Sequence, residues 1–425
     1  MSRTTLFLLN PIGTPGDIHP HLAIGRELIG KGKDVMILTT PNYRALVEDN
    51  GIPFFPIGDS INLREVTDDK RLQQPYSAWK ATLQWAAVGM MREVYSAIDS
   101  LHRPRETIVV SPPWSLGARV ARERLQIFHA SALLNPCIMR SCIDPPVLPM
   151  MPRSEWFPKW FRKLQYWIAD RCVLDPIILG EVNRFRAEFG LPRISRVMNR
   201  WWLSPDLVLG LFSESLVPLC SDWPVHIELV GHTLWDPPAL PNNSEKVHAF
   251  LDKNPGAIAV VLGSIRSGND KLLATILGAC LHLNKPVLVL TPFADHLPKA
   301  LPESVHHCVY VPLADVLRKC DLIIHSACIG TASQGLSAGI PQIAFPQVND
   351  QLDNAARLAR LGVSKTISNK GISTLGLARA IREVLSCTEI EKNCLHVSTL
   401  HRNGSAGRIA DLLTSNELNE TLVSI

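Results

Sequence analysis

The stretch richest in side chains able to do chemistry runs from residue 321 to residue 362. Residues 321–324 form a short apolar run typical of a buried parallel strand, and His325 stands where that strand should end. A loop of small residues follows and opens a segment of helical spacing at Thr331. The free N–H groups and the dipole of a helix N-terminus attract anions. The pattern therefore predicts a phosphate at Gly330 and Thr331, with His325 beside it.

A second polar pair follows the next expected strand, residues 341–345, at the start of an expected helix over residues 350–361. In open α/β sheets, ligands collect beyond the carboxyl ends of the strands. Asp350 and Gln351 should therefore lie within reach of whatever the phosphate carries. Asp350 is also a good N-cap for its helix, and one carboxylate can fill both roles.

Composition limits the function classes. At 425 residues the chain suits two domains, and 46% hydrophobic with 19% charged residues describes a globular protein. A net charge of +4 does not favour a nucleic-acid partner. No apolar run is long enough for a membrane-spanning helix or a signal peptide, and the ten cysteines form neither a zinc pattern nor a disulfide frame. We therefore expect reduced thiols and a cytoplasmic location.

Short apolar runs alternate with helical segments along most of the chain, which predicts an α/β fold with doubly wound parallel sheets. Expected strands outside the opening stretch cover residues 5–9, 34–40, 54–57, 107–110, 128–133, 257–262, 286–291 and 308–311. Expected helices include residues 20–29, 42–50, 80–101 and 116–125, and the chain is mostly helical from 372 to 413. The pattern loosens over residues 135–202.

A proline-rich stretch, residues 218–243, separates two such sets of elements. We predict a first Rossmann-like domain over residues 1–217 and a linker over 218–245. A second Rossmann-like domain should cover residues 246–385, and helices over 386–425 should cross back to the first domain.

The motifs from His325 onward resemble the donor-binding signature of the two-domain GT-B glycosyltransferases, the superfamily of UDP- and TDP-sugar enzymes. That signature has a His, a Gly-rich turn ending in Gly-Thr or Gly-Ser, an Ala-Gly-Val/Ile-Pro turn, and Asp-Gln followed by Asn. The matching residues here are His325, Gly330-Thr331, Ala338-Gly339-Ile340-Pro341, Asp350-Gln351 and Asn354. The chain departs at Ala327 and Cys328, where the family usually has glycine, and these side chains should narrow the turn.

The resemblance implies two Rossmann-like domains facing across a cleft, with the nucleotide sugar on the second domain. The diphosphate-binding residues it implies are Ser264, His325, Gly330 and Thr331, and the sugar-binding residues are Asp350 and Gln351. It also implies that Tyr310 stacks on the nucleotide base while the backbone of Val311 bonds the base edge. The family's usual Gln three positions after that ring is Leu313 here. No Asp-x-Asp metal motif stands at a strand end, so we expect neither a metal ion nor a separate cofactor.

Asp17 is the candidate general base. It lies in Gly-Asp-Ile-His-Pro directly after the first expected strand, where an N-cap is the commoner use of Asp. The resemblance favours the base, since the sterol and glycopeptide branch and the rhamnolipid-forming rhamnosyltransferases have Asp at the matching position, within Gly-x-x-Gly-Asp. His19 and His21 are alternatives because imidazole titrates in a useful range, and His19 is also a candidate acceptor contact.

Residues 156–167 (WFPKWFRKLQYW) place tryptophans at helical spacing beside Lys and Arg. A basic aromatic helix can lie in a membrane interface, line an apolar acceptor pocket, or pack on its own domain. We predict that Trp156 and Trp160 contact a lipid acceptor or a membrane surface. Membrane contact would bring the protein to the inner face of the plasma membrane as a peripheral protein.

Taken with the resemblance, these features predict an inverting glycosyltransferase. The likeness is closest to the rhamnosyltransferases that form mono-rhamnolipids, and its segments are residues 13–21, 115–119, 223–231, 310–313 and 325–362. It implies a TDP- or UDP-linked donor, with TDP-rhamnose preferred, and a hydrophobic 3-hydroxyacyl acceptor.

Three alternatives stay open at this point. One is a transferase for a polyketide, peptide or terpenoid natural product, and another is a hexosamine epimerase. The third is a non-catalytic nucleotide-binding partner protein. Asp17 together with Asp350 and Gln351 argues against the third, and the order Asp-Gln-x-x-Asn argues against the epimerase.

Overall fold

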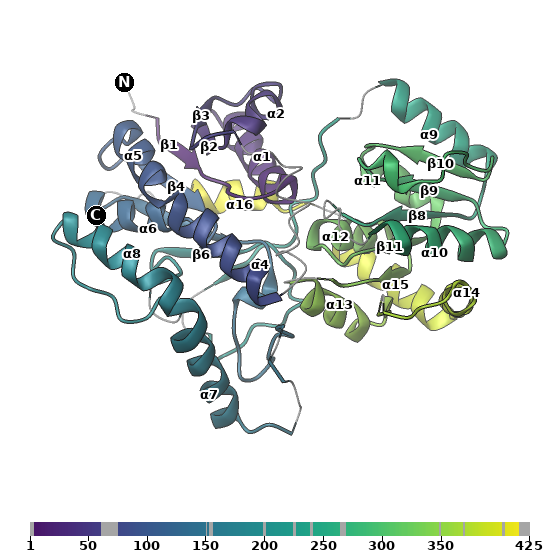
Figure 1. Cartoon of the computed structure of the whole chain (residues 1–425). Coiled ribbons are helices and arrows are strands. Elements are labelled where there is room, and N and C mark those ends of the chain that lie inside the picture. Colours follow the sequence, from purple (N-terminus) through teal and green to yellow (C-terminus); the bar gives the residue numbers. More distant parts are fainter. Residues whose placement is uncertain are drawn as a thin grey trace.

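The computed structural model describes residues 4–60, 75–149, 151–152, 156–198, 201–223, 227–238, 241–263, 269–347, 350–368, 370–401 and 404–415. These residues form two α/β domains, each built on one parallel β-sheet with helices packed against it (Figure 1). The predicted fold class, two Rossmann-like doubly wound domains, is confirmed.

The first domain has a seven-stranded parallel sheet in the order β3-β2-β1-β4-β5-β6-β7. Its strands are β1 Leu6–Leu9, β2 Asp34–Thr39, β3 Phe54–Pro56, β4 Thr107–Ser111, β5 Phe128–Leu133, β6 Leu207–Gly210 and β7 Glu228–Leu229. Its main helices are α1 Pro15–Gly30, α2 Arg44–Glu48, α4 Pro75–Thr82, α5 Met91–Leu101, α6 Leu116–Leu125, α7 Lys159–Ala169 and α8 Asp175–Glu188. The strand order reverses between β1 and β4, so a ligand is expected at the carboxyl ends of these strands.

The second domain has a six-stranded parallel sheet in the order β10-β9-β8-β11-β12-β13. Its strands are β8 Ala257–Val261, β9 Val287–Leu290, β10 Val305–Cys308, β11 Cys320–His325, β12 Gln342–Ala344 and β13 Ser364–Thr366. Its helices are α9 Pro241–Lys253, α10 Asn269–His282, α11 Leu313–Val316, α12 Ile329–Ala338, α13 Gln351–Arg360, α14 Thr374–Leu385 and α15 Thr388–His401. Here the order reverses between β8 and β11, which places the end of β11 at the expected ligand site.

Two boundaries differ from the sequence expectation in ways that affect the site. The strand expected over residues 308–311 is β10, Val305–Cys308, so Tyr310 follows the strand in the loop before α11. Helix α1 begins at Pro15 rather than at residue 20, because Thr14 is its N-cap, Thr14 and Asp17 form a capping box, and proline suits the first helical position. Asp17 therefore belongs to the first turn of α1 and is not its N-cap.

The chain crosses between the domains twice. Strand β7 lies inside residues 218–245, the expected linker, and extends the first sheet by pairing with β6. After α15, helix α16 (Ala406–Leu413) packs beside α1 in the core of the first domain, and Lys31 pairs with Asp411 at 2.6 Å. The end of α15 is also tied to the first domain, since Ser213 Oγ lies 2.6 Å from His401 Nε2. The C-terminal helices thus connect both domains (Figure 1).

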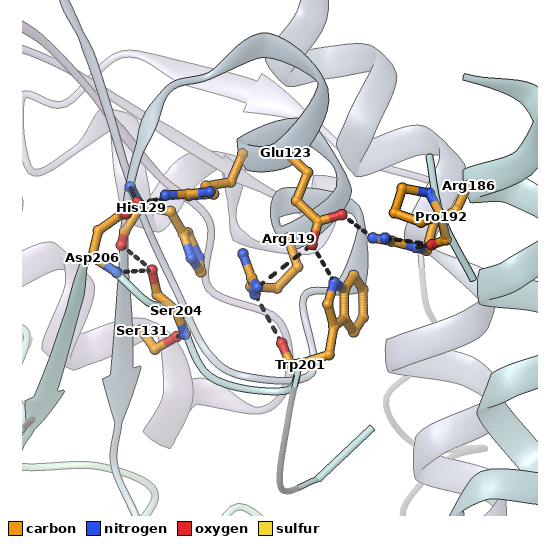
Figure 2. Close-up of polar contacts among 10 residues, drawn as sticks. Arg119, Glu123, His129, Ser131, Arg186, Pro192, Trp201, Ser204 and Asp206 are labelled. Carbon is orange, nitrogen blue, oxygen red and sulfur yellow. Dashed lines mark hydrogen bonds and ion pairs between the residues drawn. The ribbon is translucent and has the colours of Figure 1, made fainter. Parts of the chain in front are cut away.

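The long connection from β5 to β6 carries α7 and α8 and returns to the sheet through a buried polar cluster (Figure 2). Arg119 of α6 donates to Trp201 O at 3.0 Å and pairs with Glu123. The Glu123 carboxylate also accepts from Trp201 Nε1 at 2.6 Å and pairs with Arg186. Buried charges persist only when paired and hydrogen-bonded, so this cluster fixes the end of the connection to α6.

Candidate active site

A cavity of about 170 Å³ lies between the two domains. One side comes from the start of α1 and the other from the start of α12, with residues 232–236 between them. The lining residues are Gly16, His19, Pro20, Leu134, Leu211, His232, Thr233, Leu234, Trp235, Asp236, Leu313, Ile329, Gly330, Thr331, Ser333 and Gln334. We call residues 13–21 the first wall, and residues 325–331 with 350–354 the second wall.

Asp17 is held in the first wall by its own turn. Its Oδ2 accepts hydrogen bonds from the Thr14 N–H at 2.7 Å and the Thr14 hydroxyl at 3.0 Å. The carboxylate lies over Gly13, where a Cβ would stand 2.2 Å from Asp17 Oδ2 and where φ is +146°. Only glycine fits this position. The other oxygen, Oδ1, has no hydrogen-bond partner within the described part of the chain, so it can accept a proton from a ligand.

Burial shifts the pKa of Asp17 and the pKa values of the two nearby histidines in opposite directions, and this decides which of them suits the role of base. It raises the pKa of Asp17 to about 6 and lowers the pKa of His19 and of His21 to about 4. The His21 ring is buried, with Nδ1 2.9 Å from Asp17 O, while His19 lines the cavity edge-on to Trp235. Because a base works best with a pKa near the working pH, Asp17 suits proton removal better than either imidazole.

The start of α12 is open to the cavity. Its N-cap, Cys328, makes no capping bond with its side chain, and the first intrahelical bond runs from Ala332 N to Cys328 O at 2.9 Å. Among the described residues, the N–H groups of Ile329, Gly330 and Thr331 have no partner, and all three residues line the cavity. Unbonded N–H groups and the helix dipole favour an anion at this turn, and the diphosphate contact predicted for Gly330 and Thr331 stays a prediction.

Ala327 and Cys328 stand where the resembled family usually has glycine, and their side chains lie in different surroundings. Ala327 has φ of +64°, the left-handed conformation that glycine prefers, but its methyl group is fully buried against Ala344 and Ala355. The expectation that this side chain narrows the turn is therefore wrong. Cys328 does face the site, where its Sγ lies 3.3 Å from Ser326 Oγ and accepts from Gln351 Nε2 at 3.3 Å.

His325 lies in the interior, between β11 and the start of α12, and does not line the cavity. Its Nδ1 accepts the N–H of Ala327 at 3.0 Å, which leaves the proton of the neutral ring on Nε2, toward Gln342. Burial lowers the pKa of this histidine to about 4, so it stays uncharged. In this arrangement His325 shapes the turn, and direct contact with a diphosphate needs a side-chain movement. Its predicted diphosphate role stays a prediction.

Asp350, at the start of α13, lies close enough to Asp17 for their charges to interact, although neither residue lines the cavity. Its carboxylate does not cap α13, as the sequence allowed, but accepts from Asn354 Nδ2 at 2.8 Å, and the same amide donates to Ala327 O at 3.0 Å. Burial raises the pKa of Asp350 to about 6, with a further upward contribution from the charge of Asp17. The two carboxylates are thus electrostatic neighbours contributed by different domains. Gln351 is buried and accepts the Gln347 N–H at 2.9 Å.

Comparison with known proteins adds to this geometry. Residues 7–142 match the glycosyltransferase family 28 N-terminal domain, and residues 275–399 match the erythromycin biosynthesis protein CIII-like C-terminal domain. The first domain thus matches a domain of known glycosyltransferases, and the two parallel sheets form the GT-B fold of such enzymes.

Curated relatives lie at a distance. A sterol 3-beta-glucosyltransferase of Komagataella phaffii is 24% identical over 91% of this chain, and the glycosyltransferase GtfE of Amycolatopsis orientalis is 26% identical over 84% of each chain. The chain spans 32% of the length of that sterol enzyme and 26% of the one from Leptosphaeria maculans.

Solved GT-B structures share the fold over nearly the whole chain. The glycotransferase of kitacinnamycin superposes with a TM-score of 0.71 at 20% identity, covering 97% of this chain and 98% of that one. The spinosyn rhamnosyltransferase SpnG gives 0.66 at 19% identity, covering 99% and 100%. VinC in complex with DTDP gives 0.69 at 14% identity, covering 98% and 100%.

The base-binding end expected for a GT-B protein lies in the loop after β10. The Tyr310 hydroxyl donates to Pro237 O at 2.8 Å, and Val311 is buried. Next to them, Asp236 Oδ2 accepts from Leu313 N and Gln334 Nε2, each at 3.0 Å. Sequence reasoning missed Asp236. The only available signal was a single acid in the proline-rich stretch Trp-Asp-Pro-Pro.

A second feature that sequence reasoning missed joins the two domains. Asp144, in the loop after β5, pairs with Arg357 of α13 at 2.7 Å and with Arg360 at 2.6 Å. Arg357 is buried and also pairs with Asp353 at 2.7 Å, and Asp353 accepts the Val147 N–H at 2.8 Å. Since α13 follows Asp350 directly, this network holds the sugar-side helix against the first domain.

Three predicted residues remain: Ser264, Trp156 and Trp160. Ser264 is outside the described residues. Trp156, just before α7, and Trp160, in its first turn, are 93% and 67% exposed, and α7 extends from the lower side of the first domain in Figure 1. In the described ranges no three His, Cys, Asp or Glu side chains are placed to share a metal ion, and the absence of a metal requirement stays a prediction. None of the helices described is long and apolar enough to cross a bilayer.

Proposed function

We propose that this protein is an inverting glycosyltransferase that moves a sugar from a nucleoside-diphosphate sugar to a hydroxyl group. The observation that carries the proposal is that Asp17 of the first wall lies within electrostatic range of Cys328, the N-cap of the open α12 helix, and of Asp350 in the second wall. Transfer needs a base, an anion site and a means of orienting the sugar, and these groups match the three needs.

The reaction follows from their placement. Asp17 Oδ1 takes the proton of the acceptor hydroxyl while that oxygen attacks the anomeric carbon of the donor. The bond from this carbon to the diphosphate oxygen breaks, and its electron pair leaves with the diphosphate. The N–H groups of residues 329–331 stabilise the charge that develops there, and Asp350 orients the sugar through its hydroxyls. A single displacement of this kind inverts the configuration at the anomeric carbon.

The donor site is ordered along the second domain. The sugar lies by Asp350 and Cys328, the diphosphate by Gly330 and Thr331, and the base by Tyr310 and Val311. TDP is the preferred nucleotide, in keeping with the DTDP complex of VinC, and UDP is the other candidate. Rhamnose is the proposed sugar, in keeping with the sequence likeness and the shared fold of the rhamnosyltransferase SpnG.

The proposed acceptor is a hydroxyl-bearing lipid of the 3-hydroxyacyl class. The first-domain side of the cavity offers apolar surface at Leu134 and Leu211, which suits an acyl chain better than a sugar or a nucleic acid. The sterol glucosyltransferase relatives, named for an apolar substrate, favour the same class. A polyketide, peptide or terpenoid acceptor is the alternative, in keeping with the match to the erythromycin biosynthesis protein CIII-like domain and the shared fold of the spinosyn rhamnosyltransferase SpnG.

The exposed aromatic residues on α7 are proposed to contact a membrane surface or the acyl chain of the acceptor. Trp167 and Leu164 extend the apolar strip of Trp156 and Trp160, each more than 40% exposed, with Lys159 beside them. Tryptophan next to lysine suits the boundary between acyl chains and headgroups.

The decisive experiment has two stages. Melting temperature is first measured with TDP, UDP and GDP, and the nucleotide that raises it most sets the donor series. Transfer from TDP-rhamnose and TDP- or UDP-glucose is then assayed on 3-hydroxyacyl acceptors, on flavonoid and macrolide aglycones, and without acceptor. A rhamnosylated 3-hydroxyacyl product is expected. Nucleotide binding without transfer to any acceptor would favour a non-catalytic partner protein instead.

A further inference from the structure

Asp236 supplies the only carboxylate among the described residues that line the cavity. It belongs to neither wall but to the segment that joins the two domains. Its surroundings in the cavity are otherwise mainly apolar, with Leu234, Trp235, Leu313 and Ile329 close by. A buried carboxylate in such surroundings is costly unless it is hydrogen-bonded, so its partners decide its role.

One oxygen of the Asp236 carboxylate accepts hydrogen bonds from the protein, and the other accepts none from the described residues. Oδ2 accepts from Leu313 N at 3.0 Å, Gln334 Nε2 at 3.0 Å and Ala314 N at 3.5 Å, and so closes the start of α11. Oδ1 makes no hydrogen bond to any residue the structure describes. Burial raises the pKa of Asp236, and the charge of Asp315 adds to this. An acceptor oxygen that faces the cavity is therefore left for a ligand.

The position of Asp236 along α12 suggests which part of a ligand it meets. Gln334 lies one turn beyond Thr331 on α12, a rise of about 5 Å. On the other side, the residue after Asp236, Pro237, accepts the hydroxyl of Tyr310 at 2.8 Å. Asp236 thus stands between the anion site and the expected base site, which is the order of a nucleotide with its ribose in the middle.

We propose that Asp236 accepts a hydrogen bond from a ribose hydroxyl of the donor nucleotide through Oδ1. This inference rests on the proposed function, since it assumes a nucleoside diphosphate at α12. A hydroxyl fits the site better than a cation, because the positive end of the α12 dipole lies beside it. The nucleotide is then held partly by the segment between the domains, so its binding also fixes how the domains face each other.

The test compares two ligands on the intact protein. The sugar of TDP is 2′-deoxyribose, which has a single free hydroxyl, at the 3′ carbon, and 3′-deoxy-TDP lacks it. Calorimetry should give wild-type protein a preference for TDP of about tenfold or more, because a hydrogen bond to a charged group is strong. In Asp236→Ala that preference should shrink to about twofold or less. UDP and 3′-deoxy-UDP replace this pair if UDP raises the melting temperature more than TDP.

Two further variants keep the test decisive. Asp236→Asn retains the volume and an oxygen for the α11 start but loses the charge, so it should fold and still lose most of the preference. Asp315→Ala removes an exposed carboxylate on α11 and should keep the wild-type preference. A preference that persists in both Asp236 variants, or is missing in wild type, overturns the inference while TDP binding leaves the proposed function intact. Failure of wild type to bind any nucleoside diphosphate overturns both.

Discussion

Each wall of the cleft is held in shape by its own hydrogen bonds, and the two sets differ in how far apart in the sequence their partners lie. In the first wall, Thr14 bonds Asp17 three residues away and His21 contacts Asp17 four residues away. In the second wall, Asn354 bonds Ala327 across 27 residues and Gln351 bonds Cys328 across 23. The first wall is therefore a local motif, whereas the second exists only when β11, α12 and α13 have packed.

Because the contacts differ in this way, substitutions in the two walls should affect catalysis and stability differently. A change to the Asp17 side chain should alter proton transfer and leave the nucleotide site and the fold almost untouched, since among the described residues that side chain bonds only to Thr14. A change in the second wall removes contacts that also join α12 to α13, so binding and stability should fall together. If the contrast is real, variants of the two walls should differ in the ways described below.

The largest effect is expected for Asp17→Asn. The amide keeps the size of the side chain and an oxygen for the Thr14 bonds but cannot take the acceptor proton. Loss of general-base catalysis should lower kcat on the order of 10²–10⁴-fold. The Kd for the nucleoside diphosphate should stay at the wild-type value, and the melting temperature should not fall, because the variant loses a carboxylate whose ionised form burial disfavours. Calorimetry and thermal denaturation would check both. A variant within about twofold of wild type would remove Asp17 as the base and bring His19 forward.

The features that could be predicted from the sequence are those set by local contacts, and the features that could not are those set by distant ones. The parallel strands, the loop that opens α12 near Gly330 and Thr331, and the two α/β units follow from hydrophobic runs and turn residues, which are local signals. The sequence did not predict that Asp236 would meet Gln334, 98 residues away, or that Asp144 would meet Arg357, 213 residues away. Such contacts depend on how the domains pack, and a single chain carries no pattern for them.

His325 and Ala327 show the same limit at closer range. The sequence placed His325 correctly at the end of β11, but the direction of its side chain is set by the pleat of that strand and by the N–H of Ala327. The glycine preference at Ala327 has a backbone cause, φ of +64°, which no residue type reveals by itself.

The second prediction concerns Gly13→Ala. A Cβ at this position would lie 2.2 Å from Asp17 Oδ2, so the carboxylate must leave its place over the turn. We expect kcat to fall at least about tenfold, with a loss of stability of roughly 1 kcal/mol or more from the strained backbone.

Gly32→Ala is the matched control, because Gly32 has φ of +73° with no atom within 4 Å of the added Cβ. It should lose stability without losing activity. Equal activity losses in the two variants would mean that backbone strain, and not the displacement of Asp17, causes the effect.

The third prediction concerns pH. The pKa of Asp17 and that of Asp350 are each raised to about 6, so both carboxyls are protonated below this pH. The value of kcat/KM should fall as pH drops through about 6, with an ionised fraction about tenfold lower at pH 5 than well above the pKa. Stability should change in the opposite direction, because the folded state holds these protons more tightly than the unfolded state. It should therefore decline as pH rises from about 4 to above 6.

Asp350→Asn sharpens this prediction by removing one charge from the pair. The pKa of Asp17 should drop when its neighbour is neutral, so the acid limb of the kcat/KM profile should move to lower pH. The comparison uses only the pH at which kcat/KM falls in the variant and in the wild type, because the variant should also have a lower kcat. Asp315→Asn, on exposed α11, should leave the limb where it is. An unmoved limb in Asp350→Asn would show that the two walls are not electrostatically coupled.

The smallest effect is expected far from both walls, at the exposed end of α7. Trp156 and Trp160 touch neither wall, so replacing both with Ser should leave kcat on a short-chain acceptor unchanged. If α7 contacts an acyl chain or a membrane surface, the same variant should raise KM severalfold for long-chain 3-hydroxyacyl acceptors and reduce sedimentation with anionic phospholipid vesicles. The reason is that indole rings contribute apolar area at the interface while nearby lysines meet the headgroups. Trp85→Ser, at an exposed tryptophan outside α7, should change neither measurement. If chain length and vesicles make no difference, the aromatic strip has no role in acceptor delivery, and lipid specificity must then come from the cavity itself.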